Sequence, residues 1–431
     1  MTGRPPPLRD RRSFLLLNGT QFLTVFGDNA FKQGIVLYAL AVEGSRGHGA
    51  SLAQFLFSLP FLAFALYAGD LADRFPKRNV VVAAKVAEVV VMLLGALALA
   101  TRSLPLALTV VFLMGTQSAF LGPAKYGALA EYAGRPALAR ANGWFQAAMM
   151  AGILLGTGST GFLLDGFGAH PEFLPLLLAA LAALGVALAL GMRRRPPASP
   201  HRRPILAPLR RLRRGLERAG RVPGLRPAIL GHALFWAVGS LAFLAWNEAI
   251  AVRPDGTRLV AAGRGWWSVG LAAQGVFMAL GAMACGRLAL RRPLTTWVRL
   301  GLGLMVVGFA LAGLLPAHPV LVFAGTAVAS FGSGFYLIPL RTLIQGLAPP
   351  ARLGGTLGVS QMLDFVGISG AALARMALRP TALEAQGLFL LIAVALVAGG
   401  VPTVERLARA LNDARSRDAA SPGPGARRPR R

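Results

Sequence analysis

Residues 69–78, Gly69-Asp70-Leu71-Ala72-Asp73-Arg74-Phe75-Pro76-Lys77-Arg78, form a short charged segment between two long apolar stretches. A related hexapeptide, Gly286-Arg287-Leu288-Ala289-Leu290-Arg291, follows 217 positions later. Further matches recur at offsets of 215 or 216, among them Pro123 with Pro339, Lys125 with Arg341, and Gln146 with Gln361. An offset near half the chain length indicates an internal duplication, which predicts two related structural halves.

The composition places these halves in a membrane. The chain has 431 residues, of which 55% are apolar and 14% charged, with a mean hydropathy of +0.57. This is too apolar for an ordinary soluble protein. The net charge of +28 suggests an anionic partner, and the apolar content favours membrane lipid over nucleic acid. A single cysteine, Cys285, excludes a disulfide or thiolate metal site within one chain.

Stretches long enough to cross a bilayer are recognised by their lack of charge, since a spanning helix needs roughly 20 mostly apolar residues. Seven stretches qualify directly: 51–69, 103–124, 141–164, 173–192, 227–247, 265–286 and 385–404. Residues 300–340 are also uncharged, and the turn signal in 315–319 divides them into two helices. Three more stretches carry charges: 13–42, 79–101 and 353–374. The sequence therefore predicts an all-α membrane protein with twelve transmembrane helices.

The basic residues predict the orientation, because short cytoplasmic loops are rich in lysine and arginine. A cytoplasmic N-terminus puts most of the 45 basic residues on that side and brings the C-terminus there too. The predicted divisions are a basic N-terminus (1–12), a six-helix bundle (13–192), an arginine-rich linker (193–226), a second six-helix bundle (227–404) and a disordered basic tail (405–431). The linker is either a solvated connection or a helix lying on anionic headgroups.

The motif Gly69-x-x-x-Asp73-Arg74-x-x-Lys77-Arg78, with twelve predicted spans in a six-plus-six repeat, resembles the major facilitator superfamily. Pro76 stands where that motif normally has a glycine. The resemblance implies two pseudo-symmetric bundles with a transport site between them. It also implies that Gly69, Asp73, Arg74 and Arg78 belong to an inner gate that breaks when the cavity opens inward.

Four further motifs are similar to the bacterial lysophospholipid transporter family: Phe26-Gly27-Asp28-Asn29-Ala30, Gly122-Pro123-Ala124-Lys125-Tyr126-Gly127, Ala141-Asn142-Gly143 and Phe335-Tyr336-Leu337-Ile338-Pro339-Leu340. This resemblance implies that the chain flips lysophospholipid, such as lysophosphatidylethanolamine, into the inner leaflet of the cytoplasmic membrane, where a separate acyltransferase would reacylate it. One departure concerns the seventh span, because the family has a basic residue there and residues 235–243 contain none.

The first span carries the charges of greatest functional interest. Asp28 lies past the midplane, and Lys32 follows one turn later on the same helix face, so the two side chains are able to pair. One interpretation is a neutral pair that makes insertion tolerable. The other is an amphoteric site, with Lys32 for a phosphate and Asp28 for an amine or coupling cation, and Asn29 beside them.

Other polar residues within the predicted spans have two interpretations each. Lys85 and Glu88 favour a structural pair near the cytoplasmic end, where the side chains reach water. Lys125 and Arg341 either hold a lipid phosphate or cap their helices. Asp364, near the midplane, is either a coupling or amine-binding site or a hydrogen-bonding group between helices. Gln146 and Gln361 occupy repeat-related positions, where polar side chains often join helices.

The sequence favours a transporter over an enzyme. It has no Walker loop, metal-ligand cluster or nucleophile elbow, and no histidine is followed five positions later by aspartate as in an acyltransferase motif. No cofactor is therefore expected beyond a coupling cation, sodium or proton. A small-solute or drug exporter of the same architecture is the alternative to lysophospholipid transport.

Overall fold

The computed structural model describes residues 8–43, 48–134, 137–196, 208–249, 264–288, 292–315, 318–348, 353–378 and 384–420. Across these ranges the chain is helical and contains no strand. The first part comprises α1 (Arg11–Glu43), α2 (Gly49–Arg74), α3 (Lys77–Ala100), α4 (Leu104–Ala133), α5 (Leu138–Phe167) and α6 (Phe173–Leu190). After α7 (Pro208–Ala219), the second part comprises α8 (Leu225–Glu248), α9 (Arg264–Leu288), α10 (Leu294–Leu314), α11 (Pro319–Leu347), α12 (Leu353–Leu378), α13 (Ala385–Ala395), η5 (Leu396–Gly400) and α14 (Val401–Ala420).

The helices largely cover the stretches predicted from the sequence, but several extend past the predicted ends: α4 runs to Ala133 instead of 124, and α11 to Leu347 instead of 340. Residues 300–340 divide at the predicted turn, because α10 ends at Leu314 and α11 begins at Pro319. Ten of the described helices are long and apolar enough to cross a membrane. The set does not include α1, which carries charged and amide side chains, or α2, whose apolar segment Gly49–Phe64 is shorter. The chain is therefore a multi-pass membrane protein, while the number of twelve spans stays a prediction.

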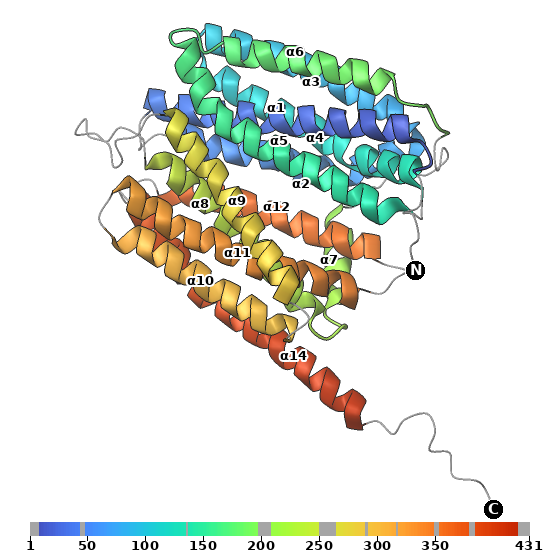
Figure 1. The fold of residues 1–431 in the computed structure, drawn as a ribbon, viewed down its shortest axis with the longest axis vertical. Coiled ribbons are helices and arrows are strands. Elements are labelled where there is room, and N and C mark those ends of the chain that lie inside the picture. Colours follow the sequence, from blue (N-terminus) through green and yellow to red (C-terminus); the bar gives the residue numbers. More distant parts are fainter. Residues whose placement is uncertain are drawn as a thin grey trace, which may run out of the picture.

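The helices form two bundles that lie side by side (Figure 1). We call α1–α6 the N-bundle and α8–α14 the C-bundle. Within the N-bundle, α1 packs against α5, α6 and α4, and in the C-bundle α8 packs against α12, α11 and α13. The principal contacts between the bundles are α2 with α12 and α5 with α9. Two bundles with equivalent interfaces are what the sequence repeat predicts.

The linker and the C-terminal segment are both partly helical. The linker contains α7, as one of its two interpretations required, and its described basic residues Arg213, Arg214 and Arg218 are exposed. The last helix continues through a π-helical turn, η5, to Ala420. The disorder predicted from residue 405 is therefore wrong as far as residue 420, and residues 421–431 lie outside the described ranges. Charge alone is a poor guide here, because an amphipathic helix also tolerates many arginines on one face.

Glycines bring α10 and α11 into close contact. A Cβ atom added at Gly301, Gly308, Gly325 or Gly332 would collide with backbone atoms of the facing helix. Small residues allow such close backbone approach, which is a main source of packing energy between membrane helices.

We expect Gly308→Val to destabilise the C-bundle by about 1–3 kcal/mol, the usual cost of overpacking. The Cβ atom would overlap the backbone of Ala329. Gly303→Val is the matched control on the same helix, since a Cβ atom there meets nothing within 4 Å. Thermal unfolding of the purified protein in detergent measures both, and equal unfolding temperatures for the two variants would contradict this packing.

Candidate functional site

The two bundles touch through side chains on α1, α2, α8 and α12. Gln33 Nε2 donates to Asn247 Oδ1 at 2.7 Å, and the Ser58 and Ser369 hydroxyls lie 2.7 Å apart. The rings of Phe61 and Phe365 stack with their centroids 4.3 Å apart. These residues belong to the later parts of α1, α8 and α12 and to the earlier part of α2. We call the end of the molecule where α1 and α8 finish the closed end.

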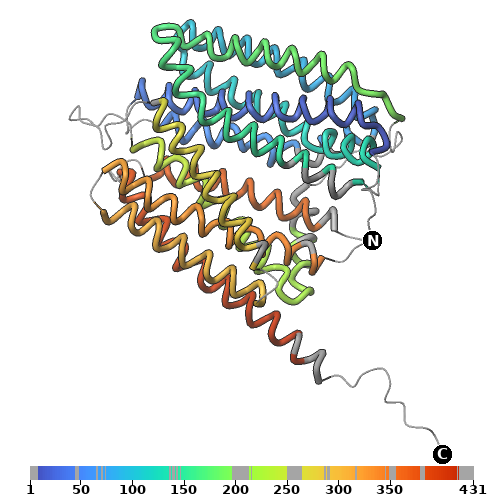
Figure 2. Tube along the Cα trace, in the orientation of Figure 1, coloured from blue at the N-terminus to red at the C-terminus, as the bar shows by residue number. Residues whose placement is uncertain are grey.

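The interface between α5 and α9 joins the bundles toward the same end. Gly265 N donates to Asp165 Oδ2 at 3.2 Å, and Phe162 packs edge-on against Trp266. These residues lie at the end of α5 and the start of α9. The two bundles diverge away from the closed end, toward the side on which α1 begins (Figure 2). The polar residues of the bundle interior lie between these two ends.

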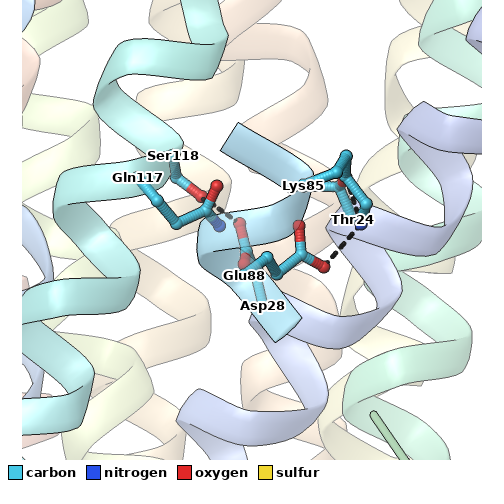
Figure 3. A network of polar contacts seen from close by, with 6 residues as sticks. All are labelled: Thr24, Asp28, Lys85, Glu88, Gln117 and Ser118. Atoms are coloured by element: carbon cyan, nitrogen blue, oxygen red, sulfur yellow. Dashed lines mark hydrogen bonds and ion pairs between the residues drawn. The ribbon is translucent and has the colours of Figure 1, made fainter. Parts of the chain in front are cut away.

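A buried polar cluster occupies the N-bundle and consists of Thr24, Asp28, Lys85, Glu88, Gln117 and Ser118 (Figure 3). Lys85 Nζ donates to Glu88 Oε1 at 2.6 Å and to Thr24 Oγ1 at 3.1 Å. Lys85 is 0% exposed and Glu88 is 1% exposed. The predicted ion pair is confirmed. The prediction that its side chains reach water is wrong, because both of them turn into the bundle. Gly185 makes this possible, since a Cβ atom there would overlap the Lys85 side chain.

Asp28 enters the same cluster from α1. Its Oδ2 atom accepts a hydrogen bond from Ser118 Oγ at 2.5 Å, and Gln117 Nε2 donates to Ser118 Oγ at 3.1 Å. Three oxygens in the cluster have no hydrogen-bond partner among the described residues: Asp28 Oδ1, Glu88 Oε2 and Gln117 Oε1. Buried polar atoms normally have partners, so these oxygens indicate a place for a ligand, water, cation or proton.

Lys32 does not form the predicted ion pair with Asp28. Its Nζ atom lies 5.1 Å from the ring centroids of both Phe57 and Phe243, within the range of cation–π attraction. Among the described residues, no carboxylate lies within ion-pair distance of it. Asp28 instead accepts a hydrogen bond from Ser118. The spacing on α1 correctly predicted that both charges lie on one helix face, but it did not identify their partners.

Lys32 lies at the contact between the bundles, because Phe57 belongs to α2 and Phe243 to α8. The described part of α8 between Phe235 and Phe243 has no basic residue of its own. Lys32 thus brings a positive charge from the N-bundle to this part of the C-bundle.

Asp364 has a partner on another helix. Its Oδ1 atom lies 2.8 Å from His232 Nδ1 on α8, and both residues are buried. The sequence suggests no partner because the two residues are 132 positions apart. A hydrogen bond between helices is therefore formed at Asp364, as one of its two interpretations required.

The other predicted residues have less specific surroundings. Asn29 Nδ2 donates to Val25 O within α1, and Gln361 is exposed. Lys125 lies near the Tyr126 ring, and its charge interacts with those of Asp28 and Glu88. Arg78 donates to Leu190 O at 2.6 Å, and Arg74 is half-buried at the end of α2. Three further predicted site residues, Gly69, Asp73 and Gln146, lie in helices, and their side-chain surroundings are outside what the structure describes.

Two structural features of the C-bundle were missed at the sequence level. Arg375 forms a buried two-point ion pair with Glu248, with distances of 2.7–3.1 Å. Trp246 and Trp267 stack at 4.1 Å, and each indole N–H donates to the backbone carbonyl of the other residue. Glu248 directly follows the uncharged stretch 227–247, and Arg375 directly follows the predicted span 353–374. Their shared position at the ends of two spans was the available signal.

The chemistry of these residues suits binding and transport. In the described part of the chain, no three His, Cys, Asp or Glu residues gather as they would around a transition metal. The interior instead offers carboxylate and amide oxygens in the N-bundle and an ammonium group at the contact between the bundles.

The family model of the Major Facilitator Superfamily matches residues 17–372. The chain belongs to this superfamily. Its members transport solutes, so this chain is a membrane transporter. Curated relatives include lysophospholipid transporter LplT of Klebsiella pneumoniae subsp. pneumoniae, 30% identical over 75% of this chain and 78% of the relative. LplT of Enterobacter sp. (strain 638) is 28% identical over 78% of this chain and 80% of the relative.

Solved structures support the facilitator fold. A point mutant of the nucleoside transporter NupG superposes with a TM-score of 0.68 at 14% identity, over 92% of this chain and 99% of the other. A POT family transporter in complex with a thioalcohol-conjugated peptide gives the same TM-score and identity, over 94% and 96%. At this identity the likeness concerns the fold alone.

We expect a double-mutant cycle on Lys85 and Glu88 to show strong coupling. Lys85→Met and Glu88→Gln each break a buried ion pair, which costs about 3–5 kcal/mol, and the double variant should cost much less than their sum. Unfolding in detergent, by heat or denaturant, gives the free energies. The exposed pair Arg299–Glu405 is the control, with a coupling energy near zero for Arg299→Met and Glu405→Gln. Additive effects at Lys85 and Glu88 would show that the ion pair is absent in the folded protein.

Proposed function

We propose that this facilitator carries lysophospholipid, such as lysophosphatidylethanolamine, across the bacterial cytoplasmic membrane. One observation carries the proposal: Asp28 Oδ1 has no hydrogen-bond partner and Lys32 has no carboxylate partner among the described residues, and both belong to one face of α1. A phosphoethanolamine headgroup is zwitterionic and complements both charges. The similarity to relatives named lysophospholipid transporters supports the same substrate class.

The transport cycle that we propose is alternating access. All twelve predicted spans cross the membrane, both termini are cytoplasmic, and the closed end faces outward. The bundles then rock about the headgroup site, so that contacts such as Gln33–Asn247 and Ser58–Ser369 break when the outer side opens. At the inner side, Gly69, Asp73, Arg74 and Arg78 form the gate. Such an equilibrium responds only to differences in binding between the two states.

The lipid reaches the inner leaflet with its chain in the membrane while its headgroup passes between the bundles. A lysophospholipid delivered there is the substrate of a separate acyltransferase, which we propose as the functional partner. Membrane lipids surround the bundles, and the exposed arginines of α7 favour anionic headgroups. Nucleic acid has no role in this scheme.

A coupling cation, sodium or proton, fits the polar cluster. Asp28 Oδ1, Glu88 Oε2 and Gln117 Oε1 are buried oxygens without partners among the described residues, and hard cations prefer such ligands. Asp364 is the less suitable coupling residue because His232 already occupies its Oδ1 atom. Lys125 and Gln146 remain candidate contacts for the headgroup on the inner side, as does Gln361 on the C-bundle.

We expect Asp28→Asn to reduce lysophosphatidylethanolamine uptake by at least about tenfold, the effect of losing one charge-assisted contact. Spheroplasts would receive a fluorescent analogue, and dithionite would quench the label that remains outside. Glu217→Gln, the same exchange on exposed α7, is the control. Absence of uptake by correctly oriented, well-expressed parent protein would favour a small-solute or drug exporter instead.

We expect Glu88→Gln to remove the dependence of uptake on sodium or pH, while Asp364→Asn preserves it. An amide at position 364 keeps an oxygen that accepts from His232, whereas an amide at position 88 removes the charge that a cation needs. Uptake per folded protein, measured with sodium replaced by an organic cation and on both sides of neutral pH, separates the two. Loss of the ion response in Asp364→Asn would move the coupling site to the C-bundle.

A further inference from the structure

A partly open cavity of about 260 Å³ lies between α8, α9, α10 and α11 of the C-bundle. Its wall is mainly aromatic and aliphatic, with side chains that include Phe243, Trp246, Met278, Met305 and Phe309. An apolar cavity of this kind holds water poorly, because water needs several hydrogen-bonding partners. A hydrocarbon chain is the ligand that such a wall stabilises.

The polar side chains in the wall are largely occupied. Thr326 Oγ1 donates to Val322 O at 2.8 Å, Ser333 Oγ donates to Ser330 O at 2.6 Å, and Ser330 Oγ donates to Gln274 Oε1 at 3.0 Å. Gln274 Nε2 is a buried donor without a partner among the described residues. The wall is thus apolar with an available hydrogen-bond donor.

The cavity reaches the contact between the bundles at Phe243. The centroid of this ring lies 5.1 Å from Lys32 Nζ, while the residue also lines the cavity. Gly275, another lining residue, faces Leu154 of α5. A positive charge without an ion-pair partner among the described residues and an apolar cavity therefore adjoin the same phenylalanine.

We propose that this cavity is an acyl-chain pocket, with Lys32 binding the anionic group of the same molecule at its mouth. The ligand class is a single-chain amphiphile with a phosphate, and Gln274 Nε2 is placed to donate to its glycerol hydroxyl or ester oxygen. The proposal rests on the proposed function and extends it. It places the acyl chain of the lipid in the C-bundle and assigns the binding of its anionic group to Lys32 of α1. It also accounts for a seventh span, α8, that lacks a basic residue in its middle.

The assignment distinguishes two ways in which a facilitator could move a lipid. If the acyl chain of the lipid stayed in the surrounding bilayer, its length would have little effect on how the lipid binds to the protein. If the acyl chain enters the pocket, a label at the chain end should crosslink to wall residues, and chains longer than the pocket should no longer fit. Because the bilayer and the pocket wall are both apolar, the place of crosslinking and this upper limit on length, rather than a steady gain per methylene, identify the pocket. Filling the pocket from its wall should lower that limit to a shorter chain.

Gly239→Leu is the variant that fills the pocket. Gly239 lines the cavity on α8, and a Cβ atom there meets nothing within 4 Å. Gly303→Leu makes the same exchange at an exposed position of α10 with equal free space, so it is the matched control. Ala242→Leu fills the cavity from another position of α8 and serves if Gly239→Leu folds poorly.

The experiment is photo-crosslinking of purified protein in nanodiscs. The probe is lysophosphatidylethanolamine with a diazirine at the end of the acyl chain, in a series from hexanoyl to palmitoyl length, and mass spectrometry locates the labelled residues. We expect labels on wall residues such as Met278 and Met305. Labelling of these residues should fall at least about tenfold in Gly239→Leu, the effect of overpacking an occupied pocket, and persist in Gly303→Leu.

Lys32 is tested with the same chain on two headgroups. Lys32→Met should lower pocket labelling by the phospholipid probe about tenfold, to the level of a monoacylglycerol probe, and Lys32→Arg should retain it. The monoacylglycerol probe should label the parent and Lys32→Met equally. Equal labelling of parent and Lys32→Met by the phospholipid probe overturns the role of Lys32.

Labels confined to the membrane-facing surface, unchanged in Gly239→Leu, would overturn the pocket even if the parent protein transports the lipid. Labels in the pocket of a parent protein that shows no lysophospholipid uptake would instead overturn the proposed function and leave the pocket standing. The crosslinking experiment therefore tests the pocket, and the uptake experiment tests the proposed function, independently of each other.

Discussion

A charge buried among apolar helices needs a partner, because each one costs about 2.5–3.5 kcal/mol at the centre of a spanning helix. Most of the described interior satisfies this constraint. Lys85 has Glu88 and Thr24, Asp364 has His232, and Glu248 has Arg375. Lys32 is held by two aromatic rings instead. Asp28, which accepts from Ser118 and has no ion pair among the described residues, is likewise less compensated than the other buried charges, and the proposed headgroup site rests on these two residues.

The two bundles share a helix order but differ in their interiors. The N-bundle buries an ionic network around Asp28 and Lys85, whereas the C-bundle has a partly open apolar cavity and packs α10 tightly against α11 through glycines. The equivalent helix contacts within the two bundles are thus kept, while the interiors differ, one being ionic and the other apolar.

The positions of most helices were predictable from the sequence, because a membrane-spanning helix excludes charged residues whichever helices surround it. The turn in 315–319 and the pair Lys85–Glu88 followed from local sequence alone. Partners on different helices did not, since they depend on how each helix is rotated about its axis. Asp28 illustrates the limit: its spacing suggested Lys32, but Ser118, 90 positions away, forms the bond. The predicted spans also left out Glu248 and Arg375, because one span ended just before each of these residues.

The reciprocal hydrogen bonds between Trp246 and Trp267 join α8 and α9 into one unit. Each indole holds the backbone of the other residue, so a small rotation of either helix strains both bonds together with the stacked rings. A displacement of α9 where it meets α5 would therefore also displace α8, so the two helices would move together with the cavity wall that they share.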